Sequence, residues 1–278
     1  MTAFSLNAKQ KHARLGRLLW IGCLFSTMYS LNSHAFSGLI SPPRFEDRVQ
    51  SGKTYRNIIE ISNVSDQPAT FSVKTNDWSL DANGGAVFSD ALAADSCRPW
   101  VGVESSSIQL AANGKRRYRF EVAVPAGTPA QQCRFALMFE GEPEVMAGSQ
   151  GIPVAGRIGV IVYLNINGAT ADLQLVDTGV QQQDRVNVPV LKIGNRGLAH
   201  GRLEGVLDAI DSTGQRISFA PANDPILPNT ERVIALYPIT PNHSDPAQAT
   251  PLINYPLTLK GKLDWQGKPI SIDVTIAP

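Results

Sequence analysis

The sequence predicts an all-β protein with two immunoglobulin-like β-sandwich domains in series. Short runs rich in β-branched and aromatic residues recur at a spacing of about 8–12 residues, which is typical of a sandwich. Clusters of Gly, Pro, Asn, Asp and Ser separate these runs and predict tight turns. No long stretch free of Gly and Pro places apolar residues at helical spacing. The runs divide into two sets of similar length, each close to the size of one sandwich.

Residues 1–35 are expected to be a signal peptide that is removed on export. A basic start without acidic residues precedes an apolar stretch from Leu18 to Leu31. Ser33-His34-Ala35 then presents small residues at the two positions that a signal peptidase reads, which predicts cleavage before Phe36. Two alternatives remain open, namely an uncleaved membrane anchor and lipidation at Cys23.

The charge of the exported part excludes two classes of partner. Of the 25 basic residues four lie before residue 36, so 25 − 4 = 21 basic side chains face 24 acidic ones. A net charge of about −3 gives no general attraction for nucleic acid or for an anionic membrane surface. We therefore expect no nucleic-acid partner and no membrane insertion after signal cleavage.

The expected strands fall into two domains, residues 36–166 and residues 167–278. In the first domain the predicted strands are Asn57–Asn63, Thr70–Thr75, Ser107–Leu110, Tyr118–Val124, Arg134–Glu140 and Gly156–Ile166. A turn cluster at Asn167-Gly168-Ala169-Thr170 ends this set. In the second domain they are Leu173–Val176, Asn187–Ile193, Arg202–Asp208, Arg216–Phe219, Arg232–Leu236, Pro256–Leu263 and Ile270–Ile276. The stretch Pro238–Pro251 is predicted to be a long exposed loop.

Two cysteines remain after signal cleavage, Cys97 and Cys133. An even pair in an exported chain predicts a disulfide bond within the first domain. Closing a loop of about 37 residues would stabilise the fold by roughly 3–4 kcal/mol. Two separate buried thiols are the alternative.

The sequence offers little catalytic chemistry. His200 and His243 lie in turn-like contexts, so we expect plain surface roles for both, and no His or Cys cluster has the spacing of a metal site. Asp177-Thr178-Gly179 is similar to the active-site loop of aspartic proteases, but the required second loop is missing and a strand-ending turn is the simpler interpretation. We expect neither enzyme activity nor a cofactor or metal.

The segment from Gly156 to Ile166 is apolar on both faces of its predicted strand. Alternation places Ile158, Val160, Val162 and Leu164 on one face, and Ile161 and Tyr163 on the other. A strand that faces water on one side would carry polar residues there. Either this chain or a partner must therefore cover the second face.

The order of these features resembles the periplasmic pilus (fimbrial) chaperones of the chaperone–usher pathway. Residues 39–63 are similar to the opening strands of that family, and residues 116–140 to its late pair of strands joined by a Pro-rich turn. Residues 156–166 fall where its last first-domain strand lies. Residues 195–215 and 225–236 are similar to its second domain.

This resemblance implies a non-enzymatic chaperone in the periplasm whose partners are pilus-like subunits and an outer-membrane usher. The last strand of the first domain would be donated to a subunit that lacks its own final strand. The implied donor side chains are Ile158, Val160, Val162 and Leu164. Two cations would anchor the terminal carboxylate of the subunit.

For these anchors the resemblance implies Arg44 and Arg157, with Arg48 as a rival for the first position. Gly156 and Gly159 depart from the bulky pattern expected of a donor strand. The alternative function is a structural or adhesive envelope protein of the same fold, whose own chain covers the 156–166 strand.

Overall fold

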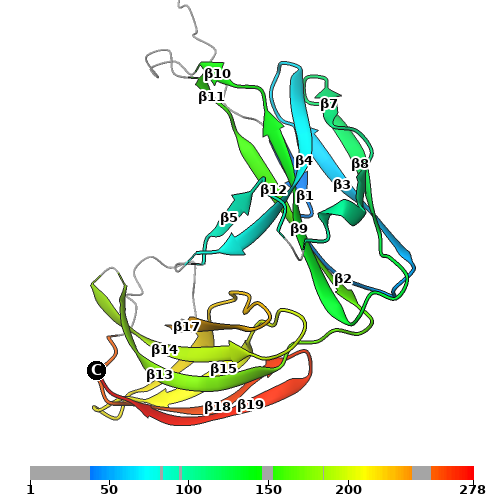
Figure 1. The fold of residues 1–278 in the computed structure, drawn as a ribbon. Coiled ribbons are helices and arrows are strands. Elements are labelled where there is room, and N and C mark those ends of the chain that lie inside the picture. The colour runs from blue at the N-terminus through cyan, green and yellow to red at the C-terminus, as the bar shows by residue number, and fades with distance from the viewer. Residues whose placement is uncertain (1–37, 82–83, 94–95, 146–152, 184, 240–251) are drawn as a thin grey trace, which may run out of the picture.

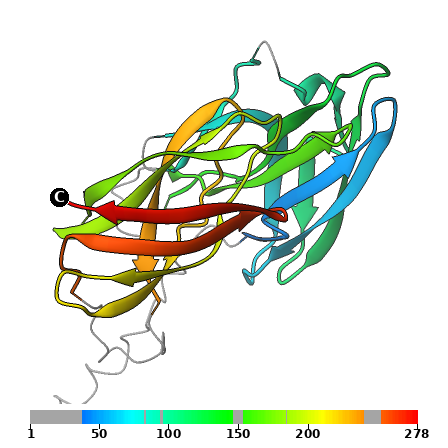
Figure 2. The same cartoon turned by 90° about the horizontal axis from the view of Figure 1, so that it is seen from below.

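A computed structural model describes residues 38–81, 84–93, 96–145, 153–183, 185–239 and 252–278. These residues form two β-sandwich domains that meet at an angle (Figure 1), and the predicted fold class is confirmed. Seen from below in Figure 2, the two sets of strands lie on opposite sides of the junction. The predicted signal peptide, His243 and most of the predicted loop at 238–251 lie outside the described residues.

The first domain consists of two packed sheets. One sheet has the order β1 (Gly38–Ser41), β3 (Thr54–Asn63), β8 (Lys115–Ala123) and β6 (Val101–Val103). The other has the order β2 (Arg44–Val49), β12 (Arg157–Ile166), β9 (Gln131–Gly141), β4 (Ala69–Leu80) and β5 (Ala86–Ser89), with β7 (Ser107–Leu110) also pairing with β4. The short strands β10 (Glu144–Val145) and β11 (Pro153–Val154) extend the β9–β12 hairpin, and a 3-10 helix η1 spans Arg98–Trp100.

The core of the first domain forms because its strands alternate. In β8, Tyr118, Phe120 and Val122 are buried, whereas Arg117 and Arg119 are exposed on the other face. Burial of this many large apolar side chains is the main stabilising term of a sandwich. The charged face of β8 is therefore the solvated side of its sheet.

The first strand of the chain is shared between the two sheets. β1 pairs with β3, and after Ser41-Pro42-Pro43 the chain continues as β2, which pairs in parallel with β12. Proline has no N–H to donate, so strand pairing is interrupted at such a point. As a result, β2 begins at Arg44 beside Ile161, and within the described ranges no strand pairs with the earlier part of β12 on that side.

The second domain is one continuous seven-stranded sheet that folds over on itself. Its order is β13 (Leu173–Gln183), β14 (Val186–Asn195), β17 (Thr230–Pro238), β16 (Arg216–Pro221), β15 (Glu204–Ile210), β18 (Leu257–Trp265) and β19 (Lys268–Ile276). All adjacent pairs are antiparallel. No strand pair among the described residues joins this sheet to those of the first domain.

The predicted end of the strand at Val176 is wrong. β13 continues to Gln183, with a bulge between Leu175 and Asp177, so Asp177-Thr178-Gly179 lies inside a strand and not in a turn. The amide N–H of Thr178 donates to the Asp177 carboxylate at 2.8 Å. A bulge accommodates the extra residue, which explains why alternation alone ended the strand too soon.

The link between the domains is fixed to the first domain at its start. The side chain of Asn167 donates to the carbonyl of Thr128 at 2.8 Å and accepts from the amide of Ser51 at 2.9 Å. Asn167 and Gly168 both have positive φ angles, of 51° and 75°. Asparagine and glycine tolerate this region, so the chain turns sharply as it leaves β12.

Candidate functional site

The edge of β12 is the feature on which the expected function depends. β12 pairs along its whole length with β9, but β2 covers its other edge only from Ile161 to Ile166. The part of the chain that the structure describes supplies no strand beside Arg157–Val160 on that side. We call this unpaired edge, Arg157–Val160, the open slot.

Backbone hydrogen bonds show which groups face the open slot. The amide of Gly141 donates to the carbonyl of Gly156 at 3.0 Å, and the amide of Ile161 donates to the carbonyl of Pro43 on the other side at 3.3 Å. Backbone groups of successive strand residues point alternately to the two edges. The N–H and C=O groups of Arg157 and Gly159 therefore point into the open slot.

The inner face of β12 belongs to the core of its own domain. Val160, Val162 and Leu164 are fully buried in the same cluster as the other core residues. In this conformation these side chains pack in their own domain and offer no surface to a partner, and their expected role as donors to a guest stays a prediction. Ile158 is the one member of the expected donor set that is only partly buried.

The outer face of β12 is covered by the same chain as well. Ile161 and Tyr163 belong to a second apolar cluster that includes Trp78 and Met138 from the neighbouring strands and Leu227 from the second domain. Trp78 packs edge-on against Tyr163, with ring centroids 5.4 Å apart. The question raised by this apolar strand thus has a structural answer, because intramolecular side chains cover both faces of its second half.

Phe88 of β5 covers the outer face at the open slot. A Cβ atom on Gly159 would lie 2.7 Å from Cζ of Phe88 and 3.0 Å from the sulfur of Met138. The guanidinium carbon of Arg157 lies 6.0 Å from the centroid of the Phe88 ring. Gly159 therefore allows the β4–β5 hairpin to cross this face, which explains the small residue in an otherwise bulky strand.

The two expected carboxylate anchors lie at opposite ends of the open slot. Arg44 is paired with Ile161 at the lower end, and Arg157 stands at the upper end. Arg44 forms an ion pair with Glu46 at 2.7 Å, whereas Arg157 lies 3.7 Å from Glu140. The structure does not bring the two guanidinium groups together on one carboxylate.

Arg48, the rival for the first anchor, is an exposed residue farther along β2. It is paired with Asn165, within the half of β12 whose edge is already occupied. Of the two arginines on β2, Arg44 is the one beside the open slot.

Below the slot, His200 joins the two domains, so its expected surface role is wrong. It lies between β14 and β15 and is 3% exposed. Its ring stacks on that of Tyr163 with centroids 3.8 Å apart, and its Nε2 atom lies 3.4 Å from Glu46. Gln132 accepts from the backbone N–H of His200 at 3.1 Å.

Glu46 is the charged centre of this joint. Its carboxylate contacts Arg44 of the first domain and, at 3.4 Å, Arg202 of the second. The hydrogen bond from His200, together with the charges of both arginines, lowers the pKa of Glu46 to about 2 despite partial burial. Burial lowers the pKa of His200 below its usual value, although Glu46 acts in the opposite direction. The joint therefore holds an ionised carboxylate beside a neutral imidazole.

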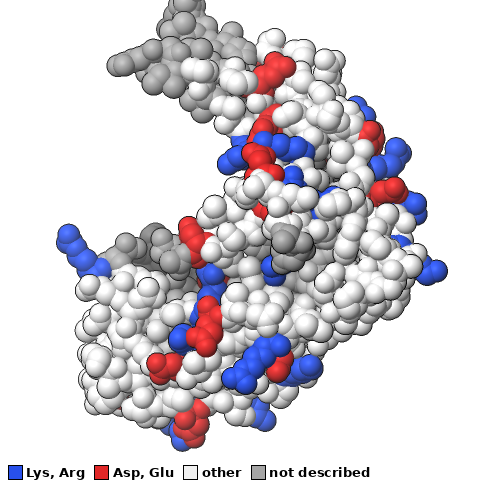
Figure 3. All heavy atoms as spheres, in the orientation of Figure 1, with Lys and Arg blue, Asp and Glu red and all other residues white. Residues whose placement is uncertain are grey.

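A cleft lies on the inner side of the angle between the domains, where Figure 3 shows the surface hollowed. Its volume is about 920 Å³. One wall is the tip of the β4–β5 hairpin, with Leu80 and Asp81, and the other is the sheet that contains Gln181, Arg232 and Tyr237. A Cβ atom on Gly84 would lie 2.2 Å from Nη2 of Arg232, so the hairpin tip reaches the second domain.

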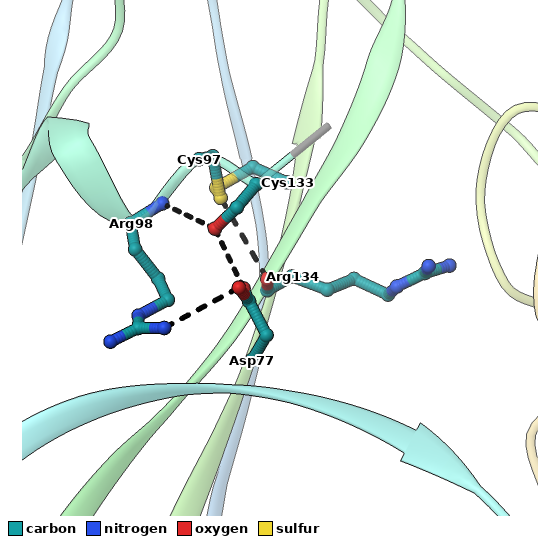
Figure 4. The surroundings of a disulfide bond; sticks show 6 residues. Asp77, Cys97, Arg98, Cys133 and Arg134 are labelled. Carbon is teal, nitrogen blue, oxygen red and sulfur yellow. Dashed lines mark hydrogen bonds and ion pairs between the residues drawn. A yellow bond between two sulfur atoms is a disulfide. The ribbon is translucent and has the colours of Figure 1, made fainter. Parts of the chain in front are cut away.

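The predicted bond between Cys97 and Cys133 is present, with Cα atoms 5.6 Å apart. Figure 4 shows its surroundings, in which Asp77 of β4 accepts from the hydroxyl of Ser96 at 2.6 Å and contacts Arg98 at 3.4 Å. Both cysteines are buried. The bond fastens the segment before η1 to the start of β9.

No group of three or more His, Cys, Asp or Glu side chains in the described ranges has the arrangement of a metal site. Over the same residues, none of the helical structure is long and apolar enough to cross a bilayer. Asp177 accepts from the adjacent backbone N–H of Thr178 and lies opposite Lys192 of β14.

Sequence reasoning missed the joint between the domains. Glu46, Gln132 and Arg202 read as ordinary surface residues of strands and turns, because nothing in local alternation reports a contact between distant domains. The one available signal was His200 itself, which follows the apolar residues Leu198 and Ala199 in a turn.

No family model and no curated protein matches the chain. Among solved structures, it is similar to the YadV chaperone, with a TM-score of 0.46, 10% identity, and coverage of 86% of this chain and 99% of that one. The chaperone DraB of E. coli has a TM-score of 0.45 and 12% identity, with coverage of 88% and 99%. The SafB chaperone of Salmonella enterica, solved in complex with the SafA pilin, has a TM-score of 0.46 and 11% identity, with coverage of 87% and 98%. In each of these three comparisons the similarity extends over most of this chain and nearly all of the chaperone.

Proposed function

We propose that this protein is a periplasmic chaperone that holds a pilus-like subunit by accepting one of its strands into the open slot beside Arg157–Val160, before the subunit passes to an outer-membrane usher. The observation that carries the proposal is the unpaired edge itself. An exposed edge offers unpaired N–H and C=O groups to another chain, and proteins usually cover or charge such edges. The sequence resemblance of residues 39–63 and 156–166 to pilus chaperones points the same way.

In this proposal main-chain hydrogen bonds supply most of the affinity. The N–H and C=O groups of Arg157 and Gly159 face the slot, and strand addition relies on such groups. Ile158, which is partly buried, is the side chain that would contact the guest on the inner face. The buried residues Val160, Val162 and Leu164 would support the strand from behind and not enter the guest.

Arg44 is the anchor that suits this geometry. The slot lies in line with β2, so a guest strand parallel to β12 would end at the start of β2, beside Arg44. A terminal carboxylate there would meet the guanidinium, which is 44% exposed and binds carboxylates in bidentate fashion. Arg157 lies on β12 four residues before Ile161, the partner of Arg44, so it would flank the other end of the guest strand.

Two substitutions at one position test the proposal. Arg157→Pro removes an N–H that points into the slot, whereas Arg157→Ala removes only the guanidinium; neither disturbs a hydrogen bond to β9. Each variant would be co-expressed with a pilus-type subunit that lacks its final strand, and the recovered complex would be measured. We expect Arg157→Pro to lose the subunit and Arg157→Ala to retain most of it. A folded Arg157→Pro protein that retains the subunit at the wild-type level would rule out pairing at this edge.

One observation favours a second function, a structural or adhesive envelope protein of the same fold. Both faces of β12 are covered by the chain itself over Ile161–Ile166, as that function requires. In that case no subunit would be recovered with the wild-type protein or with either Arg157 variant.

A further inference from the structure

The contact between the two domains contains a hydrogen-bond network with one defined proton arrangement. Gln132 of β9 bonds to three groups: its Oε1 accepts from the backbone N–H of His200 at 3.1 Å, and its Nε2 donates to Asn165 at 2.6 Å and contacts Nδ1 of His200 at 2.8 Å. Because Nε2 of an amide can only donate, Nδ1 of His200 must be the acceptor. The ring proton therefore lies on Nε2, which faces Glu46 at 3.4 Å.

We propose that Gln132 holds His200 in this neutral form and that the resulting network locks the angle between the domains, so that uptake of a proton by His200 releases the lock. A protonated ring would place an N–H on Nδ1 against the amide N–H of Gln132. Turning the amide over would remove the clash, but would also break the bonds of Gln132 to the His200 backbone and to Asn165. Both ways of accepting the proton weaken contacts across the joint.

Charged and titratable side chains face His200 from the elements packed against it. Glu46 on β2 favours a positive charge on the ring. Arg44 on the same strand and Arg202 beside His200 already contact that carboxylate, and their charges disfavour protonation of the ring. Tyr163 of β12 is neutral because burial raises its pKa to about 12, although the charge of Arg134 on β9 acts on that pKa in the opposite direction. Burial of the ring is the dominant influence, and it favours the neutral form.

His200 is fixed firmly within its own domain, which lets a local change act on the whole domain. The next residue, Gly201, exchanges two backbone hydrogen bonds with Ile226, at 3.1 and 2.8 Å. The preceding Ala199 accepts from the side chain of Asn195 at 2.8 Å. A loop held on both sides cannot absorb a displacement of the ring, so repulsion at Gln132 would move the second domain relative to the first.

The test compares the angle between the domains at different pH values. Small-angle X-ray scattering would be recorded from about pH 8 to about pH 5, the range in which histidine titrates, with circular dichroism to show that both sandwiches stay folded. In the wild-type protein the mean radius of gyration, or the width of its distribution over the ensemble, should increase as the pH falls. His200→Asn keeps an acceptor for Gln132 and does not titrate, so its scattering should not change with pH.

Gln132→Glu is the decisive variant because its response should have the opposite sign. The two carboxylate oxygens accept from the backbone N–H and from a protonated Nδ1, so the joint should be closed at low pH and loosened at high pH. A response with the wild-type sign, or a pH response that His200→Asn retains, would overturn the proposal.

A second measurement needs no variant. Nitrogen-15 spectra of the wild-type imidazole should show the Nε2–H tautomer near neutral pH. The Nδ1–H tautomer, or a scattering profile that stays constant while the ring titrates, would also overturn the proposal. The lock is independent of the open slot, so failure of either proposal leaves the other standing.

Discussion

Glu46 shows how one partly exposed side chain can connect two domains. It belongs to a strand of the first domain, yet two of its three charged or polar neighbours, His200 and Arg202, come from the second. A single surface ion pair contributes little to stability, whereas a network around one carboxylate contributes more. The effect of this residue should therefore appear as a pH dependence.

We predict that Glu46→Gln lowers the free energy of unfolding at neutral pH and that this deficit disappears in acid. The folded pKa of about 2 lies below the ordinary value of 4.5, so the folded state binds the proton less readily than the unfolded chain. The stabilisation is complete above pH 4.5 and is lost as the pH falls towards 2. Urea titrations across this range would check it, and a deficit that stays constant with pH would contradict it.

Leu164 illustrates the difference between an expected donor and a core residue. It is fully buried, and truncating a buried leucine removes packing contacts and leaves a cavity. We predict that Leu164→Ala lowers the free energy of unfolding by about 2–5 kcal/mol. Arg157→Ala on the same strand is the matched control and should change it by less than about 0.5 kcal/mol. If both variants change the free energy of unfolding by similarly small amounts, Leu164 is not needed for the core, which would support its expected role as a donor to a partner.

At the scale of elements, the β4–β5 hairpin and β12 are fitted to each other at one point. The Phe88 ring occupies the space above Gly159, and the hairpin then continues to Arg232 in the second domain. The hairpin therefore covers the outer face of the open slot and also forms one wall of the cleft between the domains.

We predict that Gly159→Ala destabilises the first domain by about 1–3 kcal/mol because the new methyl group overlaps Phe88. The loss should be largely absent when the same change is made in a Phe88→Ala background, since the ring that causes the overlap is gone. A double-mutant cycle by chemical denaturation measures this coupling. Purely additive effects would show that the overlap is relieved elsewhere.

Much of this arrangement could be predicted from the sequence, because alternation and turn residues are local properties. They led to the sandwich class and to most strands, whereas the disulfide bond was predicted from the even number of cysteines in the exported chain. The same local patterns could not show that Val160, Val162 and Leu164 face their own core, because both faces of that strand are apolar. The covers of the outer face, Phe88 and Leu227, come from distant parts of the chain. Long-range contacts of this kind leave no periodic signal.

At the scale of the whole molecule, three separate contacts between described residues join the two domains. They are the network around His200, the packing of Leu227 against Trp78 and Tyr163, and the approach of Gly84 to Arg232. The hollow visible in Figure 3 lies on the inner side of the angle that these contacts hold. Loss of any one contact should loosen the angle without unfolding a domain.

We predict that replacing both cysteines by serine lowers the free energy of unfolding of the first domain by about 3–4 kcal/mol, since the bond joins two residues that are 36 positions apart in the sequence. Chemical denaturation of this variant, with the second domain followed separately, measures the change. A loss shared equally by both domains would mean that they unfold as one unit.

Cys133 is the immediate neighbour of Gln132, the residue that holds His200. The disulfide bond thus restrains the backbone beside Gln132, the residue through which the first domain contacts the second. Before the two thiols are oxidised, the backbone at Gln132 would be less rigid and the orientation of the second domain less well defined. The final arrangement of the domains would therefore form only in a compartment where disulfide bonds are made.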